Sequence, residues 1–151
     1  MNPAFQIMLG FTHALIGMAL CKLLHLSNNF LEIGLAAAFA VLPDIDHPSS
    51  LFGTLLHPVS AALYSRVGHR AFTHSAVFMA IVLTPMLFTP YFLLAFTAIA
   101  SHLLSDAITF TGIPLLWPFN RNFTVLGGII KTGSWTEYAI SIICLGGVLI
   151  C

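Results

Sequence analysis

Five long apolar runs constrain this chain more than any other feature of its sequence. Only a few polar residues interrupt each run, and short polar segments separate the runs. The runs cover residues 5–24, 30–42, 73–89, 91–110 and 134–151. A helix that crosses a bilayer needs about 20 mainly apolar residues. The pattern therefore predicts an all-α polytopic transmembrane bundle of about five membrane helices, in a single integral membrane domain over residues 1–151.

Composition excludes several other classes of protein. Charged residues make up 7% of the chain, the net charge is zero and the mean hydropathy is +0.97. Such a chain cannot cover a globular surface with polar groups, and it lacks the charge of a disordered or nucleic-acid-binding protein. We expect membrane lipid as its environment and possible substrate, and no nucleic acid as a stable partner. The sequence leaves the oligomeric state open, and its three cysteines lack metal-type spacing.

The polar middle of the chain, residues 44–71, contains a mixed stretch over 51–64. This stretch predicts one interfacial or re-entrant helix. Residues 112–133, rich in proline, glycine and asparagine, predict a loop. Ser134 and Glu137 have the spacing of a capping box, which predicts a helix start at that point.

Ionisable residues gather where these runs would meet one membrane face. If the five runs span in turn, the start of the first, the end of the second, the start of the third and the end of the fourth all lie on the same side. His13, Asp44, His74 and Asp106 each belong to one of these four positions. Ionisable side chains at membrane depth are costly and mark functional sites by default. Their convergence predicts a polar site near one membrane face.

The local spacings favour a metal centre. His102 and Asp106 are four residues apart and project from one face of a helix. Asp44 and Asp46 would point the same way only in an extended segment, so we expect this segment to be non-helical. His69 and His74 converge only if His69 lies in the loop and His74 in the first helical turn.

Together these residues form one set of candidate metal ligands. The set is His13, Asp44, Asp46, His47, His69, His74, His102 and Asp106. So many donors exceed the three or four of one tetrahedral site and fit two metal ions or more. Zinc is the expected ion, with manganese, iron or magnesium as alternatives. For catalysis we expect roles for Asp46, for His74 and for Arg70, whose guanidinium matches phosphate oxygens.

The motifs that carry these residues also resemble a known family. The chain reads T-H-A-L-I-G from Thr12, L-P-D-I-D-H-P from Leu42, G-H-R-A-F-T-H-S from Gly68, S-H-L-L-S-D from Ser101 and G-I-P-L-L-W-P-F from Gly112. From about residue 10 to Glu137 it resembles the YdjM-like family of bacterial membrane-bound proteins, described as predicted metal-dependent hydrolases. The skeleton is also distantly similar to zinc-dependent phospholipase C and P1-type nucleases, which implies a multinuclear zinc cluster and phosphoester hydrolysis.

The expected function is metal-dependent hydrolysis of a phosphoester, carried by a membrane lipid or a related substrate. Two alternatives remain open: a metal-ion or proton transporter, and a non-catalytic membrane protein with a structural metal. The expected location is the bacterial inner membrane, crossed several times. Arg66, Arg121 and Lys131 would lie on the side of the amino terminus and Lys22 on the other, which predicts that the amino terminus and the site face the cytoplasm.

Overall fold

The computed structural model describes residues 3–68, 71–119, 123–125, 128–131 and 133–150, and for residues 3–9 it describes the backbone only. Within these residues the chain forms seven α helices and one short 3-10 helix, η1. The helices are α1 (Pro3–Leu23), α2 (Phe30–Val41), η1 (Leu42–Asp46), α3 (Leu51–Leu55), α4 (His57–Val67), α5 (Ala76–Met86), α6 (Phe92–Ala107) and α7 (Trp135–Ile150). The all-α part of the expected fold is therefore confirmed.

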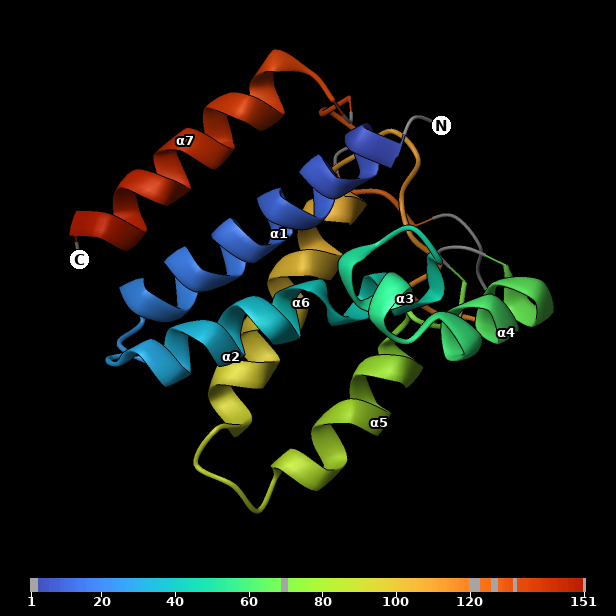
Figure 1. Ribbon diagram of the computed structural model, residues 1–151, viewed down its shortest axis with the longest axis horizontal. Helices are drawn as coiled ribbons and strands as arrows, with labels where there is room; N and C mark the ends of the chain where they lie inside the picture. Colours follow the sequence, from blue (N-terminus) through green and yellow to red (C-terminus); the bar gives the residue numbers. More distant parts are fainter. Residues whose placement is uncertain (1–2, 69–70, 120–122, 126–127, 132, 151) are drawn as a thin grey trace.

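Three helices, α1, α2 and α6, pack against one another at the centre (Figure 1). Small side chains let them approach closely: Ala36 and Ala40 of α2 and Ala98 of α6 are fully buried together with Cys21 and Leu94. Helix α7 packs on the outer side of α1, and α5 packs on α6. The central helices thus form a frame whose end next to η1 carries the polar residues.

Helix ends follow local chemistry. The Asn29 side chain accepts a hydrogen bond from the Glu32 amide and begins α2, while the Ser75 hydroxyl accepts from the Phe78 amide and begins α5. Helix α2 ends at Val41, and the 3-10 helix η1 follows it directly, with Leu42 before Pro43 still in the right-handed α conformation. Helix α7 begins one residue after Ser134, as the capping-box spacing predicts. The Glu137 carboxylate accepts from the Gly133 amide rather than from that of Ser134.

The expected polytopic transmembrane bundle is contradicted. Within the described ranges, no helix combines the length and the apolar character that a membrane crossing requires. Three of the apolar runs are longer than the helices that they form: α5 has 11 residues, and α6 and α7 have 16 each, whereas α1 has 21. At about 1.5 Å per residue these three helices are shorter than the roughly 30 Å hydrocarbon layer. Parts of the runs over 73–89 and 91–110 form turns, such as the one that contains residues 73–75.

Two further expectations about the middle of the chain are wrong. Residues 51–64 do not form one helix, because α3 ends at Leu55 and α4 begins at His57, with Pro58 in its first turn. Proline suits the first turn of a helix, where its missing amide hydrogen costs nothing, and so it starts a new helix here. His74 does not lie in the first turn of α5 but in the turn before it.

The loop expected over residues 112–133 packs against the turn that carries His74. The Ala76 amide donates to the Leu115 carbonyl, with a nitrogen–oxygen distance of 2.9 Å, and the rings of Phe72 and Trp117 meet edge to face, with 5.5 Å between their centroids. Gly112 has a positive φ of 62°, and a Cβ there would lie 2.6 Å from the Phe123 carbonyl oxygen. The contacts of Leu115 and Trp117 therefore hold the turn that carries His74 in place.

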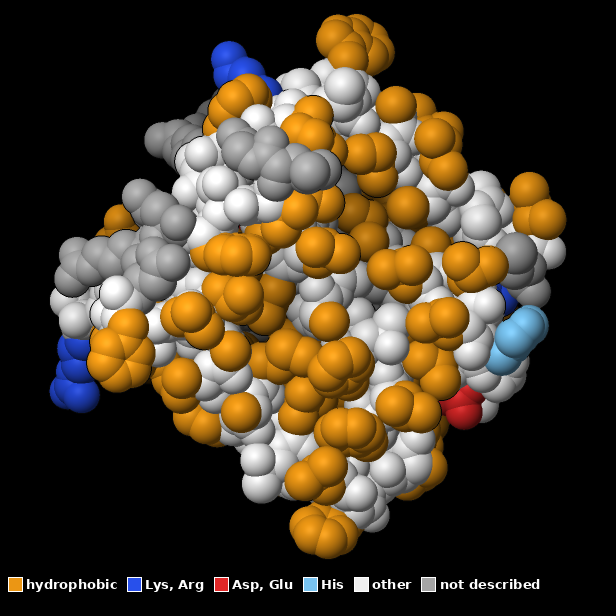
Figure 2. All heavy atoms as spheres, turned by 180° about the vertical axis from the view of Figure 1, so that it is seen from behind, with side chains coloured by type: hydrophobic (Ala, Val, Ile, Leu, Met, Phe, Trp, Pro, Cys, Tyr) orange, Lys and Arg blue, Asp and Glu red, His pale blue; other side chains and the backbone are white. Residues whose placement is uncertain are grey.

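Much of the surface is apolar. Figure 2 shows apolar side chains spread over the face opposite to the one in Figure 1, with charged groups near its edges. Phe30, Phe88 and Ile150 are each more than four-fifths exposed. The low polar content that the composition indicates is thus visible on the folded molecule.

Candidate metal centre

Four segments that are distant in sequence bring five polar side chains together. His13 comes from α1, Asp44 from η1, His74 from the turn before α5, and His102 and Asp106 from α6. The three imidazoles and Asp106 are buried, and the Asp44 side chain keeps 16% of its surface exposed. We call these five residues the histidine–aspartate cluster. They form two overlapping groups whose ligand atoms lie within 4.8 Å of one another, His13–Asp44–His102 and His74–His102–Asp106.

Their spacing matches a tetrahedral metal site. Ligand atoms at about 2.1 Å from a tetrahedral ion lie about 3.4 Å from one another. The Nε2 atoms of His74 and His102 are 3.2 Å apart. Asp106 Oδ2 lies 3.2 Å from Nε2 of His74 and 3.5 Å from Nε2 of His102. Asp44 Oδ1 lies 3.6 and 3.8 Å from the same two nitrogens. Five of the six edges of one tetrahedron thus have suitable lengths.

The ring orientation of His102 follows from its hydrogen bond to the backbone. Its Nδ1 lies 2.6 Å from the Ala40 carbonyl oxygen, and a carbonyl can only accept. Nδ1 therefore carries the hydrogen, and the neutral ring presents the lone pair of Nε2 to the cluster. This arrangement is typical of metal-binding histidines.

Hydroxyl groups orient His13 and His74 in the same way, by accepting a hydrogen bond from Nδ1 of each ring. Ser105 donates its hydroxyl hydrogen to the His102 carbonyl, so its oxygen accepts from Nδ1 of His13 at 2.8 Å. Thr73 donates to the Asp46 carboxylate at 2.8 Å, so its oxygen accepts from Nδ1 of His74 at 3.0 Å. All three imidazoles thus direct Nε2 toward the two carboxylates. The donor set and its hydrogen-bonded supports fit a divalent ion such as zinc.

Asp106 connects the two halves of the cluster. Its Oδ2 faces His74 and His102, while its Oδ1 lies 3.5 Å from Nε2 of His13. A carboxylate that offers one oxygen to each side suits the bridging position of a two-metal site. The His13 and His102 rings also stack, with 3.9 Å between their centroids. The arrangement therefore offers four donors to one ion, with His13 and the second Asp106 oxygen beside them.

The negative charges of Asp44 and Asp106 favour a bound cation in the cluster. Burial alone would raise the pKa of Asp44, but the positive charges of the neighbouring histidines, His102 first, outweigh it and hold that pKa well below its usual range. Burial likewise disfavours ionised Asp106, yet His13 and the hydrogen bonds from the imidazoles keep its pKa well below normal. Two buried carboxylates therefore remain ionised near neutral pH, and a divalent ion would balance them.

The two inner imidazoles respond to burial in opposite ways. Burial lowers the pKa of His102, and the neighbouring His13 lowers it further. Burial acts in the same direction on His74, but hydrogen bonds to Asp106 and Asp44 outweigh it and raise the pKa of His74 to about 9. In the metal-free protein, His74 therefore carries the proton whose charge a metal ion would replace.

Asp46 does not join the described cluster, because the segment over Asp44 is not extended as expected. In a 3-10 helix each residue turns the chain by about 120°, so residues two apart point in different directions. Asp44 faces the histidines, and Asp46, fully buried, accepts from Thr73. His47 lies outside both groups; its Nδ1 accepts from the Ser49 amide. The remaining two predicted residues, His69 and Arg70, lie outside the described part of the chain.

Sequence reasoning missed the residues that orient the imidazoles. Thr73 and Ser105 are neighbours of predicted ligands, and their hydroxyls lie within two motifs that were singled out for other residues. A hydroxyl three residues after His102 on a helix lies on the same side as that histidine, which is a signal available in the sequence. The Ala40 carbonyl carries no such signal, because only the packing of α2 on α6 brings it to His102.

The fold and the cluster define an all-helical protein built around buried histidines and aspartates. Its family follows from comparison: the YdjM inner membrane protein family matches residues 8–150, so the chain belongs to this family, which supports a membrane location.

Individual relatives agree with this membership. The chain is 36% identical over 140 residues to the Bacillus subtilis (strain 168) protein named "Uncharacterized protein YvsG", covering 88% of this chain and 87% of that protein. It is 42% identical over 93 residues to "Inner membrane protein YdjM" of Escherichia coli (strain K12), covering 55% of this chain and 47% of the relative, and equally to that of Shigella flexneri. It thus spans about half the length of these two relatives. No solved structure matches the chain.

Proposed function

We propose that the chain is a metal-dependent hydrolase that cleaves a phosphoester carried by a membrane lipid or a related molecule. The observation that carries the proposal is the near-tetrahedral set of His74, His102, Asp44 and Asp106 donor atoms. Asp44 is the most exposed of these ligands and also lines a large cavity. A ligand set that opens onto a cavity favours a catalytic metal over a closed structural one.

The chain's own residues would have distinct tasks in this reaction. The histidine–aspartate cluster would hold one or two divalent ions, with zinc the best match to its donors and manganese, iron or magnesium as alternatives. A bound ion supplies two things: a lowered pKa of a coordinated water and polarisation of a phosphoryl oxygen. Thr73, Ser105 and the Ala40 carbonyl keep the imidazoles in the orientation that binding requires. Overall, phosphorus gains a bond to the water oxygen, its bond to the alcohol breaks, and one water proton passes to the alcohol.

Arg70 would stabilise charge on the phosphate. This role comes from its place in the G-H-R-A-F-T-H-S motif, since the residue lies outside the described ranges. A guanidinium offers paired donors to two phosphate oxygens, whereas a lysine offers a point charge. Arg70→Lys should therefore lower turnover more than it lowers metal content.

The test is a combined measurement of metal content and hydrolysis. Purified protein loaded with Zn²⁺ or Mn²⁺ should hydrolyse the soluble diester bis(4-nitrophenyl) phosphate or phospholipid in vesicles, and a chelator should abolish both metal content and activity. His102→Ala and Asp106→Asn should each lower metal content and activity at least tenfold. His57→Ala removes an exposed histidine of α4 and is the matched control.

Two outcomes would contradict the proposal in different ways. Full metal content in both cluster variants would exclude the metal site. Metal-dependent cation flux into proteoliposomes without hydrolysis of either ester would instead favour the transporter. The expected cytoplasmic orientation of the site depends on a count of five spans, and the helix lengths contradict that count. Labelling of engineered cysteines in intact cells would determine on which side of the membrane the site lies.

A further inference from the structure

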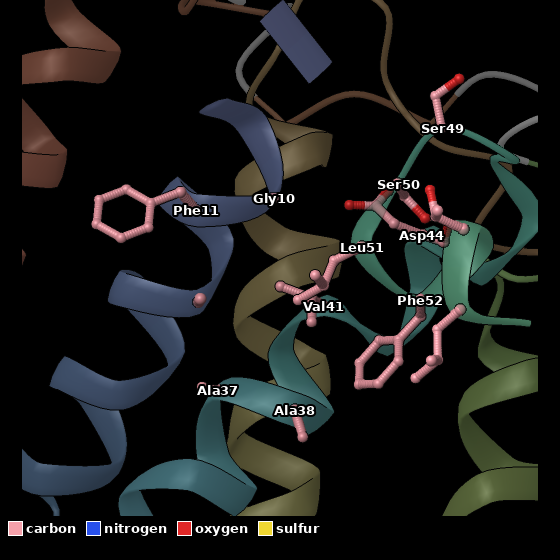
Figure 3. Close-up of a pocket in the computed structure, with 13 residues that line it drawn as sticks. Gly10, Phe11, Ala37, Ala38, Val41, Asp44, Ser49, Ser50, Leu51 and Phe52 are labelled. Atoms are coloured by element: carbon pink, nitrogen blue, oxygen red, sulfur yellow. The ribbon is translucent and has the colours of Figure 1, made fainter. Parts of the chain in front are cut away.

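A large cavity adjoins the histidine–aspartate cluster. It encloses about 950 Å³ between α1, α2 and the segment from Asp44 to Leu55 (Figure 3). Gly10 contributes from α1, Ala38 and Val41 from α2, and Phe52 from α3. This volume lies toward the upper end of the range of about 300–1,000 Å³ that is usual for small-molecule sites. The cavity is therefore large enough for a substantial part of an organic ligand.

The walls of this cavity are apolar apart from one end. Asp44 is the only ionisable side chain among the described residues that line it, and the same carboxylate belongs to the cluster. Two of the three lining hydroxyls are already engaged, since Ser50 donates to the Asp44 carbonyl and Thr54 to the Pro48 carbonyl, and the third residue, Ser49, is exposed. A sugar or a nucleobase would find few hydrogen-bond partners in such a cavity, whereas a hydrocarbon needs none.

We propose that this cavity binds one hydrocarbon chain of an amphiphilic phosphoester, so that the ester lies at Asp44 beside the cluster. The inference rests on the proposed function, because it assigns the chain-binding part of the same site. Leu51 and Leu55 line the cavity and are each 74% exposed, which gives a chain an apolar way in. The distance from the cavity wall to the ester would then select substrates by chain length.

Gly10 allows this cavity to be narrowed without disturbing the fold. A Cβ at Gly10 would meet no other atom within 4 Å, so a larger side chain there extends into open space. Gly34 of α2 is also helical, and a Cβ there would likewise meet no atom within 4 Å. It is exposed, however, and does not line the cavity. Gly10→Leu and Gly34→Leu are therefore a matched pair, and both replace glycine with a better helix former.

The experiment uses alkyl 4-nitrophenyl phosphate diesters with alkyl chains from about 4 to about 16 carbons. Each methylene that the cavity buries should raise kcat/KM about fourfold, until the cavity is full. Gly10→Leu should lower kcat/KM for the longest chains about tenfold through KM, leave the shortest unchanged, and move the plateau to shorter chains. Gly34→Leu should behave like the unmodified protein. Binding of an uncharged fluorescent polyene alcohol to metal-free protein gives a second readout and should weaken in Gly10→Leu alone.

The results separate this inference from the proposed function. Metal-dependent hydrolysis with equal kcat/KM for all chain lengths, and polyene binding unaffected by Gly10→Leu, would overturn the chain site and leave the hydrolase standing. No hydrolysis of any diester, with polyene binding weakened in Gly10→Leu alone, would overturn the hydrolase and support the cavity as a hydrocarbon site. Equal weakening in Gly10→Leu and Gly34→Leu would also overturn the chain site.

Discussion

Among single residues, Thr73 has a specific role, because its hydroxyl links His74 to the buried Asp46 carboxylate. Removing such a support costs about 10- to 100-fold in metal affinity, because the imidazole loses its fixed orientation. Thr73→Val should show this loss at nearly unchanged volume, and Thr73→Ser, which keeps the hydroxyl, should restore most of the affinity. Competition with a chelating dye measures both.

A control shows whether the hydroxyl or the change of residue type matters. Thr84 lies exposed on α5, and its hydroxyl donates to the Ala80 carbonyl far from the cluster. Thr84→Val should leave metal affinity unchanged. If Thr73→Val binds metal as tightly as the unmodified protein, the orienting role of Thr73 is wrong.

The raised pKa of His74, about 9, predicts proton release when metal binds. Below this pKa the metal-free ring is protonated, and its Nε2 must lose that proton before it can coordinate a metal ion. Metal affinity should therefore rise with pH up to about 9, and binding at pH 7 should release about one proton from His74. Calorimetric titration in two buffers of different ionisation enthalpy counts the protons. The count should fall by about one in His74→Ala; an unchanged count would contradict this assignment.

At the scale of elements, the contact between α1 and α2 sets the position of a backbone atom in the site. A Cβ on Gly17 of α1 would lie 2.4 Å from the Ala40 Cβ, so the two helices touch where only glycine fits. The Ala40 carbonyl, at the same place on α2, holds His102. The close packing of α1 on α2 therefore also affects the orientation of the His102 imidazole.

Gly17→Ala should force α1 and α2 apart. We expect it to lower the free energy of unfolding by about 1–3 kcal/mol, as overpacking does, and to weaken metal binding because the Ala40 carbonyl moves. Gly34→Ala, at an exposed and open helical position, should instead stabilise by roughly 0.5–1 kcal/mol. Thermal and denaturant unfolding of the metal-free protein compares the two. Equal stability of both variants would show that the close contact is absent.

At the scale of the whole molecule, the cluster joins four distant segments of the chain. A metal ion held by α1, η1, the turn before α5 and α6 binds only the folded state, so it should stabilise the entire fold. At a free concentration about 100 times Kd this effect is about 2.7 kcal/mol. The thermal midpoint should rise with Zn²⁺ and return with a chelator, whereas His102→Ala should show little response. His57→Ala should respond like the unmodified protein, and a midpoint insensitive to metal would contradict the site.

Individual residues show how far sequence reasoning reached. The spacing of His102 and Asp106 on one helix predicts a shared face, because the period of an α helix is fixed by the backbone. For Asp44 and Asp46 the same reasoning failed, since the conformation of the five-residue segment Leu42–Asp46, which contains Pro43, depends on what packs around it. Helix lengths failed for a related reason: an apolar run does not reveal which of its residues the folded chain spends in turns.

The helical class, the start of α2 and the start of α7 could be predicted from the sequence alone, because capping residues act within a few residues. It also supplied the chemistry of the cluster, since histidine and aspartate side chains are the donors whatever their position. The packing of the folded chain sets the orientation of Asp44 toward the histidines, the support of His74 by Asp46 through Thr73, and the orientation of His102 by a backbone carbonyl. These outcomes depend on contacts between segments far apart in the chain, which local propensities do not encode.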